Sequence, residues 1–480
     1  MCGVLGVYGL ETVEEVLRML SLLTHRGQDA SGVLWVGEDD HSIQVVKDKT
    51  YPSLLRIPDT KATIAVGSTR YPTYGSRPAS ESEVEHYAQP FSRKTTHGDI
   101  GSVHNGQLTN TPLLSNHITY TSDSEVICHL LAQGIEKYGL DYPLVVNELM
   151  KLLDGSYAEL VVVNTTPEPT LLAFRDPQGI RPLVMGMRGN TYLFASESVA
   201  IEQLGGTIVR DVRPGELVVT TKRGGEVILE SHDLCHQSAH HCMFEFVYFA
   251  SPASIIEERS VYKVRCRLGK ALGREVLKRK LDVDYVVPVP DSSRISAQTI
   301  AEEVRVPLRE AILKNRYHTA RTFIMNDGEE RRRALDTKYV FVSDYIKGKS
   351  LLVVDDSIVR GTTSKRLIQK LKEAGAASVY FASTCPPIIR PCYYGIDMTS
   401  DNDLIAHNKS LAEIQDLLGA DCVIYQGIGD LFEAIGLNDL CTACVTGEYP
   451  TAGGRLIRRL LSEGKIDPNL SHYEQILEVQ

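Results

Sequence analysis

Hydrophobic residues follow two different rhythms along this 480-residue chain. Up to about residue 230, short β-rich runs are separated by Gly, Pro and Asn turns, as at 62–69, 158–164, 170–174 and 216–221. Two stretches, 13–23 and 124–138, have helical periodicity instead. The pattern predicts a layered α+β domain, and the run VVVNTTPEPTLLAF predicts a hairpin with a proline-bearing loop.

After about residue 260 the apolar runs become continuous, which suits strands buried on both faces. These runs are DYVVPVP, SLLVVDD, SVYFAST and DCVIYQG. Helical patterns alternate with them, and one of these patterns, TSKRLIQKLKEAG, ends at Gly375. The alternation predicts a parallel, doubly wound α/β sheet. We place the boundary between the two halves near residues 231–242, and we expect a peripheral helix and tail over 455–480.

Charge and composition narrow the classes of function. The formal net charge of −10 argues against general nucleic-acid binding but leaves room for a local pocket for a phosphorylated small molecule. No run reaches the ~18 apolar residues of a membrane helix, and no signal peptide is evident. We therefore expect a cytoplasmic protein with neither nucleic acid nor membrane as partner. In that compartment the ten cysteines are core residues, metal ligands or catalytic thiols rather than disulfides.

The most informative stretch is LLVVDDSIVRGTTSKRL, residues 351–367. A predicted buried strand ends in Asp355 and Asp356, and a glycine and three hydroxyl residues follow before a helix begins. The unpaired N–H groups and the dipole of that helix suit a phosphate. The two acids could bind ribose hydroxyls or hydrated Mg²⁺. The alternative is that the hydroxyls are ordinary helix caps and the acids a solvated strand end. The lysine of a Walker A loop is absent.

Taken in order, this string resembles the 5-phosphoribosyl-1-pyrophosphate (PRPP) loop of type I phosphoribosyltransferases. The resemblance implies that the acids contact the ribose and that the loop backbone holds the 5-phosphate. The residues assigned to PRPP are Lys338, Asp355, Asp356, Arg360, Gly361, Thr362, Thr363 and Ser364. A second turn, PVPDSS, implies that Ser293 lies near the Mg²⁺–pyrophosphate end, with Asp355 and Asp356 as the other Mg²⁺ ligands.

The chain begins MCGVLGVYG, which places a thiol at residue 2. Removal of Met1 would give Cys2 a free α-amino group with a pKa of about 7.7–8.0, able to take the thiol proton. This start and four further motifs resemble class II glutamine amidotransferases of the N-terminal-nucleophile type. Those motifs are THRGQDASG, GSTRYPTYG, VHNGQLTN and TSDSE. Cys2 is then the expected catalytic nucleophile.

The resemblance also implies roles for five other residues. Asn105, through its side-chain amide, and Gly106, through its backbone N–H, would form the oxyanion site. Arg70 would pair with the α-carboxylate of glutamine, and Asp123 would take its α-ammonium group. Arg26 resembles a residue near the glutamine pocket. Taken alone, Asn105–Gly106 could be a capped turn and Arg70 a surface ion pair.

Together the two sets of motifs resemble the amidophosphoribosyltransferase family, over nearly the whole chain to about residue 450. The implied fold is an N-terminal-nucleophile αββα glutaminase domain (2–235), a type I phosphoribosyltransferase parallel-sheet domain (255–450) and a C-terminal helix and tail (451–480). The implied reaction converts PRPP, glutamine and water to 5-phosphoribosylamine, glutamate and pyrophosphate, the first committed step of purine synthesis. The resemblance also implies a homotetramer and feedback inhibition by purine nucleotides.

The motif CTAC is a weak metal signal by its spacing, which leaves zinc, a redox pair or chance open. A subgroup of the resembled family carries a [4Fe–4S] cluster. The matching cysteines are Cys242, Cys392, Cys441 and Cys444. We therefore expect a structural iron–sulfur cluster, with Mg²⁺ as the second cofactor.

Two segments depart from the family pattern. The expected lid, residues 315–339, begins NRYHTARTFI, one residue longer than usual, and its cation-rich end contains Asp336. The segment usually written YFARPDS reads YFASPAS, with Ser251 and Ala253. These changes keep two alternatives open. One is a paralogue with an intact glutaminase but an altered or weakened transferase, and the other is a non-catalytic PRPP- or nucleotide-sensing protein.

Overall fold

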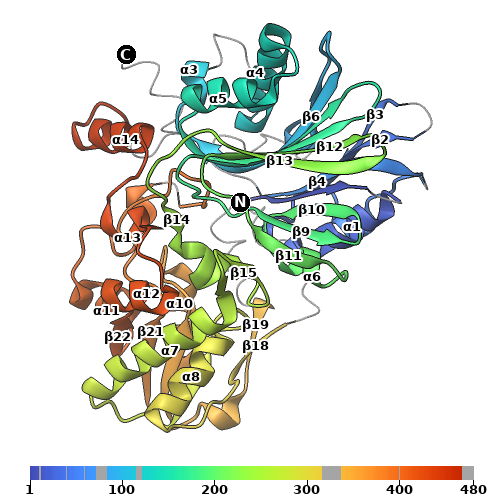
Figure 1. The fold of residues 1–480 in the computed structure, drawn as a ribbon. Coiled ribbons are helices and arrows are strands. Elements are labelled where there is room, and N and C mark those ends of the chain that lie inside the picture. The colour runs from blue at the N-terminus through green and yellow to red at the C-terminus, as the bar shows by residue number, and fades with distance from the viewer. Residues whose placement is uncertain are drawn as a thin grey trace.

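The computed structural model describes residues 1–9, 12–38, 41–58, 60–71, 84–114, 122–315, 337–398 and 400–467. Figure 1 shows two bodies, with the amino-terminal half (blue to green) above the carboxyl-terminal half (yellow-green to red). The amino terminus lies close to the place where the halves meet. Residues 316–336 of the expected lid, with Asp336, lie outside the described residues.

The amino-terminal half contains two antiparallel sheets. The first has the order β11-β9-β10-β1-β4-β2-β3. Its strands are β1 Gly3–Tyr8, β2 Ala30–Gly37, β3 Ile43–Asp48, β4 Ala62–Arg70, β9 Val184–Arg188, β10 Thr191–Ala195 and β11 Thr207–Asp211. The second has the order β13-β12-β8-β7-β6-β5. Its strands are β5 Phe91–Arg93, β6 Asp99–Leu108, β7 Gly155–Asn164, β8 Thr170–Arg175, β12 Glu216–Arg223 and β13 Glu226–Asp233.

These sheets pack face to face, and their central strands are buried on both faces: alternate side chains meet the partner sheet, and the others meet the covering helices. Val4 and Val66 of the first sheet share a core with Leu160 and Val218 of the second. Helix α1 (Glu14–Ser21) covers the outer face of the first sheet, and α4 (Asp123–Tyr138) and α5 (Tyr142–Leu152) cover that of the second. The result is the expected αββα arrangement. The predicted hairpin is confirmed, with β7 antiparallel to β8.

The carboxyl-terminal half is built on a parallel sheet of order β17-β20-β21-β22. Its strands are β17 Tyr285–Pro288, β20 Ser350–Asp355, β21 Ser378–Ser383 and β22 Cys422–Tyr425. Helices α7 (Val261–Lys278) and α8 (Arg294–Val304) cover one face, and α10 (Thr362–Glu373) and α11 (Leu411–Leu418) cover the other. All four strands lie where continuous apolar runs predicted them, so the doubly wound interpretation is confirmed.

A third core joins the two halves. Here β14 (His241–Cys242) pairs in parallel with β23 (Leu440–Cys441), beside the π-helical turn η4 (Glu245–Phe249). Met1 is buried in this core. Helix α14 (Ala452–Ser462) contributes Ile457 and Leu460 to it, so the helix expected to be peripheral is partly buried. The tail, 468–480, lies outside the described residues.

Smaller elements complete the chain. They are α2 Val84–Tyr87, α3 Thr111–Leu114, α6 Val199–Glu202, β15 Ile255–Ile256, β16 Arg259–Ser260, β18 Ile312–Lys314, β19 Tyr339–Phe341, α12 Ile428–Ile435 and α13 Ala443–Thr446, with the 3₁₀ turns η1 Thr24–Arg26, η2 Pro52–Leu54, η5 Ser343–Tyr345 and η6 Asp401–Asp403. Strands β18 and β19 pair with each other and flank the expected lid. In the described part of the chain, every helix is too short or too polar to span a bilayer.

Candidate active sites

Cys2 lies directly before β1, a central strand of the first sheet, and is almost fully buried. Its backbone N–H donates to Asn105 Oδ1 over 3.2 Å, and the N–H of Gly3 donates to Thr69 Oγ1 over 3.2 Å. A Cβ on Gly3 would lie 2.8 Å from Thr69 Oγ1, so no larger residue fits there. The strand therefore holds the thiol in a fixed place.

Asn105 and Gly106 lie in β6, on the facing sheet. Asn105 is fully buried, and among the described residues its Nδ2 has no hydrogen-bond partner. An unpaired buried donor costs roughly 1–3 kcal/mol, which a ligand oxygen would recover. A Cβ on Gly106 would lie 2.0 Å from the Ser156 carbonyl oxygen, so this strand admits only glycine. Both residues expected at the oxyanion site thus lie beside Cys2.

Arg70 and Asp123 reach the same buried region from β4 and α4. Burial lowers the pKa of Arg70, while the charges of Cys2, Asp29 and Asp123 oppose the shift. Asp123 Oδ2 accepts a hydrogen bond from the Leu108 N–H over 3.1 Å, which fixes its carboxylate. One cation and one anion near a thiol suit an amino-acid substrate with two charged ends.

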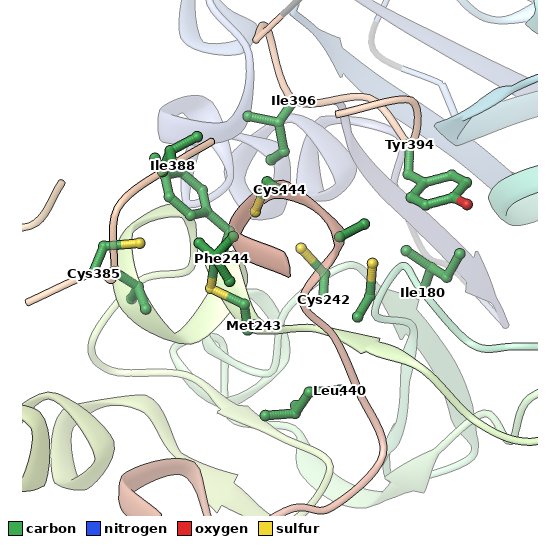
Figure 2. Close-up of a cluster of buried hydrophobic side chains, with 14 of the residues drawn as sticks. Ile180, Cys242, Met243, Phe244, Cys385, Ile388, Tyr394, Ile396, Leu440 and Cys444 are labelled. Atoms are coloured by element: carbon green, nitrogen blue, oxygen red, sulfur yellow. The ribbon is translucent and has the colours of Figure 1, made fainter. Parts of the chain in front are cut away.

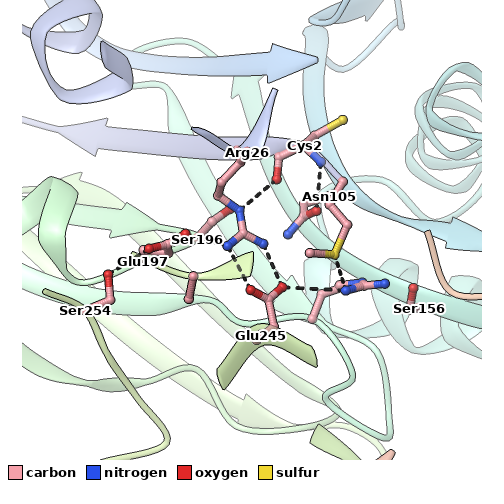
Figure 3. A network of polar contacts seen from close by, with 12 residues as sticks. Cys2, Arg26, Asn105, Ser156, Ser196, Glu197, Glu245 and Ser254 are labelled. Carbon is pink, nitrogen blue, oxygen red and sulfur yellow. Dashed lines mark hydrogen bonds and ion pairs between the residues drawn. The ribbon is translucent and has the colours of Figure 1, made fainter. Parts of the chain in front are cut away.

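Arg26 is fully buried and engaged by the protein itself (Figure 3). Its Nε donates to the Cys2 carbonyl over 3.1 Å, and its Nη1 and Nη2 donate to Glu197 and Glu245 over 2.6 and 2.7 Å. The two glutamates raise its pKa against the opposing effect of burial. Its place near the glutamine pocket stays a prediction, because all these contacts are to protein. Sequence reasoning missed both glutamates.

The altered segment YFASPAS packs against the same network. The Ser251 N–H and the Ser254 hydroxyl both donate to Glu197 Oε2, over 2.8 and 2.7 Å. The Ala253 N–H donates to the Ser251 hydroxyl oxygen over 3.3 Å. The departure from the family pattern therefore lies one residue away from the Arg26 guanidinium.

Asp355 and Asp356 end β20 at the carboxyl edge of the parallel sheet, where open α/β sheets bind their ligands. Burial raises the pKa of both carboxyl groups, and for Asp355 the charge of its neighbour raises it further. Two hydroxyls contact Asp356: that of Ser292, and that of Ser357, which donates to Oδ1 over 2.8 Å. Such a concentrated pair of acids suits a cationic or hydroxyl-rich ligand.

Gly361 stands at the amino terminus of α10 with φ +74°, a conformation that favours glycine. A Cβ there would lie 2.4 Å from Ile405 Cδ1. The first helical turn contains Thr362, Thr363 and Ser364, as the loop motif predicts. Arg360 is half-exposed, with Nη2 3.5 Å from Asp403 Oδ2.

Ser293 and Lys338 complete the predicted PRPP residues. The Ser293 hydroxyl donates to the Val289 carbonyl, so it is Ser292 rather than Ser293 that contacts Asp356. Lys338, near the end of the expected lid, has its pKa lowered by burial and by Lys314, against the attraction of Asp355 and Asp356. Lys338 therefore lies near the two acids.

The four predicted cluster cysteines gather in the core that joins the halves. Cys242 and Cys441 are register partners across β14 and β23. Cys392 accepts the Tyr394 N–H on its sulfur over 3.4 Å, and Cys444 lies in α13. Burial raises the pKa of Cys242 to about 11. Burial also raises the pKa of the Cys441 thiol, and the nearby Cys242 and Cys392 raise it further.

Figure 2 shows Cys242 and Cys444 with a further cysteine, Cys385, among apolar side chains. Cys385 is fully buried in this core, where it packs as a small hydrophobic side chain. Within the described ranges, no three His, Cys, Asp or Glu side chains are grouped as they would be around a metal ion.

Comparison with known proteins identifies the family. An amidophosphoribosyltransferase from Methanothermobacter thermautotrophicus is 38% identical over 468 residues, covering 94% of both chains. The chain belongs to the amidophosphoribosyltransferase family. The Escherichia coli member is 37% identical over 462 residues, covering 91% of this chain and 88% of that one. The family model described as a glutamine amidotransferase domain matches residues 77–203.

A solved structure agrees with the family assignment. The glutamine PRPP amidotransferase of B. subtilis, complexed with ADP and GMP, superposes with a TM-score of 0.81 at 32% identity. The match covers 94% of this chain and 97% of that one. Membership in the amidophosphoribosyltransferase family, expected from the motifs, is thereby confirmed.

Proposed function

We propose that the protein is a glutamine-dependent amidophosphoribosyltransferase that makes 5-phosphoribosylamine, glutamate and pyrophosphate from PRPP, glutamine and water. One observation carries the proposal. The same chain places Cys2 beside Asn105, whose Nδ2 has no partner among the described residues, and, in its other half, places Asp355 and Asp356 shortly before the phosphate-type turn of α10. Each half supplies what one half-reaction needs.

Glutamine hydrolysis uses the amino-terminal half. Once Met1 is removed, the nitrogen that now donates to Asn105 Oδ1 becomes the α-amine of Cys2. That amine takes the thiol proton, the sulfur attacks the amide carbon, and the protonated amine returns the proton to the departing ammonia. Asn105 Nδ2 and the Gly106 N–H stabilise the oxyanion, each donor contributing ~3–4 kcal/mol. Water then cleaves the thioester and releases glutamate.

Removal of Met1 is part of the proposal. With Met1 in place, burial lowers the pKa of its α-amine to about 5, so that amine is neutral and enclosed. The Met1 side chain fills the core beside the cysteines. Trimming frees the nitrogen next to the sulfur, where an N-terminal nucleophile needs its base.

Transfer to PRPP uses the carboxyl-terminal half. Ammonia forms the C–N bond at the anomeric carbon as the bond to pyrophosphate breaks. The first turn of α10 would hold the 5-phosphate, and Asp355 and Asp356 would bind the ribose hydroxyls. Mg²⁺ would be held by Asp355 and Asp356, beside the Ser292 hydroxyl, since hard carboxylate oxygens suit it, and it would neutralise the pyrophosphate.

A [4Fe–4S] cluster on Cys242, Cys392, Cys441 and Cys444 is proposed as a structural cofactor. The support is the donor set: Cys242, Cys441 and Cys444, from distant segments, lie in one buried core, and Cys392 packs against it. Thiolates suit iron–sulfur clusters or zinc, and the family subgroup favours the cluster. Bound there, it would tie the junction to the carboxyl end.

Regulation, assembly and location complete the proposal. The B. subtilis structure was solved with ADP and GMP, which supports purine nucleotides as feedback inhibitors here. A homotetramer follows from the family resemblance, as does a cytoplasmic location.

One assay tests the function. Purified protein is supplied with glutamine and Mg²⁺, with and without PRPP, and glutamate and pyrophosphate are measured together. Equal amounts of the two products, dependent on PRPP, are the expected result. Glutamate alone would indicate the paralogue with a weakened transferase. Neither product, with PRPP still bound, would indicate a sensing protein.

A further inference from the structure

Gln89, which belongs to none of the motifs, hydrogen-bonds to the backbone next to the predicted oxyanion site. It lies in the loop before β5 and is 4% exposed. Its Oε1 accepts the His104 N–H over 2.5 Å, and its Nε2 donates to the His104 carbonyl over 3.0 Å. His104 directly precedes Asn105. One side-chain amide thus satisfies both backbone groups of the neighbouring residue, as a paired strand would.

The same Nε2 faces the nucleophile. It lies 3.9 Å from Cys2 Sγ, at the outer range of a hydrogen bond to sulfur, and 3.0 Å from Ser124 Oγ. The two amide hydrogens have nearer acceptors in the His104 carbonyl and Ser124 Oγ, so the sulfur shares one of them. Ser124 follows Asp123 at the start of α4. A single side chain therefore touches the thiol, the strand of the oxyanion site and the helix that carries the predicted ammonium ligand.

The ionisable groups around Cys2 bear on the role of the Gln89 Nε2 donor. His104 Nδ1 lies 3.0 Å from Ser124 Oγ, and burial lowers the pKa of His104, so the ring is neutral. Behind it, burial raises the pKa of Glu159 well above its usual value, and the charge of Asp123 adds to the shift. Arg70 is a cation close to the sulfur, and its ion-pair partner is Asp29, whose Oδ2 lies 3.6 Å from Arg70 Nη1. An amide N–H can favour a thiolate without adding net charge.

We propose that Gln89 is a positioning residue for glutamine hydrolysis. It fixes the position of the Cys2 sulfur relative to Asn105 and Gly106, and its Nε2–H favours the thiolate form. Only a carboxamide provides the donor and the acceptor that this place requires. The inference rests on the proposed role of Cys2 as nucleophile.

The test uses Q89M, which keeps the volume but removes both polar atoms, and Q89E, which keeps the shape but loses the donor. The rate of Cys2 alkylation by iodoacetamide is followed against pH, by mass spectrometry of the amino-terminal peptide. Both variants should shift the profile to higher pH, and Q89E should shift it further because its carboxylate opposes a thiolate. This readout needs no turnover, so it remains valid if the proposed reaction is wrong.

Turnover provides the second readout. Q89M should lower kcat for glutamine about 10- to 100-fold, the loss expected for a hydrogen bond to a charged group, with KM little changed. Ammonia-dependent phosphoribosylamine formation should stay at the parent level. The matched control is Q178M, because Gln178 is also largely buried but its side chain bonds to Gln237 rather than to the residues around the thiol.

An unshifted alkylation profile in Q89E overturns the inference, as does parent-level kcat in Q89M. Equal loss of glutamine and ammonia activity in both variants also overturns it, because the residue would then support the fold as a whole. If Q89M fails to fold, Q89E alone decides. If the parent protein has no glutaminase activity, the proposed function is refuted. The alkylation profile then still tests whether Gln89 influences the Cys2 thiol.

Discussion

Arg26 and Glu245 join the two halves of the molecule at the predicted nucleophile. Arg26 Nη2 donates to Glu245 Oε1 over 2.7 Å, while Nε of the same guanidinium donates to the Cys2 carbonyl over 3.1 Å (Figure 3). Glu245 lies three residues after Cys242, in the turn that leads toward α7. Two residues separated by 219 positions thus fix the strand that carries the thiol.

Glu245→Gln should weaken both stability and glutamine use. Removing one partner of a buried ion pair typically costs about 3–5 kcal/mol, and the retained contact to Glu197 should keep the loss near the lower end. Urea denaturation measures the stability, and the ratio of glutamine- to ammonia-dependent turnover measures the effect on Cys2. Glu230→Gln, which removes an exposed pair with Arg223, is the control. An unchanged ratio would show that the pair serves only the fold.

Asn105→Ala should lower kcat for glutamine by about 10²–10³, as loss of one oxyanion donor does. The reason is that the buried Nδ2 has no other partner in the described chain. Steady-state kinetics with PRPP measures the effect. Asn105→Asp keeps the acceptor for the Cys2 N–H but loses the donor, so it should be at least as slow. Parent-level activity in both variants would remove Asn105 from the oxyanion site.

Short sequence motifs predict many residues of the two candidate sites, but they do not predict all of them. Gly106 and Gly361 were predictable because a short motif encodes the tight backbone that each requires. The strands of the parallel sheet were predictable because each is a continuous apolar run. Gln89, Glu197 and Glu245 were not, because their partners lie far away in sequence and each glutamate or glutamine looks like a surface residue. The choice of Ser292 over Ser293 depends on rotamers that spacing does not report.

Asp355→Asn should raise the KM for PRPP about tenfold or more, since a charged hydrogen bond to the ribose is lost. Its stability should equal or exceed that of the parent, because burial and Asp356 disfavour the charge that the substitution removes. Kinetics and thermal unfolding measure the two effects together. Asp344→Asn, on the surface of the same half, is the control. A destabilised variant with normal KM would contradict the assignment.

Protein purified without oxygen should be brown and contain about four irons per chain. Cys444→Ser should lose iron and the visible absorbance, because Cys444 is one of the four predicted ligands. Cys422→Ser should keep both, since Cys422 lies in β22 and has no predicted role. Metal analysis and absorption spectra make the measurement. A colourless protein that holds zinc would replace the cluster with a structural zinc site.

Asp211 should make stability depend on pH at the junction between the halves. Burial, and then the charge of Glu257, raise its pKa to about 7, while Arg175 opposes the shift. Because this pKa lies above the unfolded value of about 3.9, the folded protein holds the extra proton between these two pH values. The contribution of Asp211 is therefore complete below about pH 4 and is lost as pH rises through about 7.

Asp211→Asn removes this titration. The urea midpoint of the variant should therefore rise relative to that of the parent as pH is raised from 5 to 8. The midpoints of both proteins are measured at each unit of pH. Asp282→Asn, at an exposed position before β17, should follow the parent throughout. Parallel curves for Asp211→Asn and the parent would show that Asp211 does not hold this proton in the folded protein.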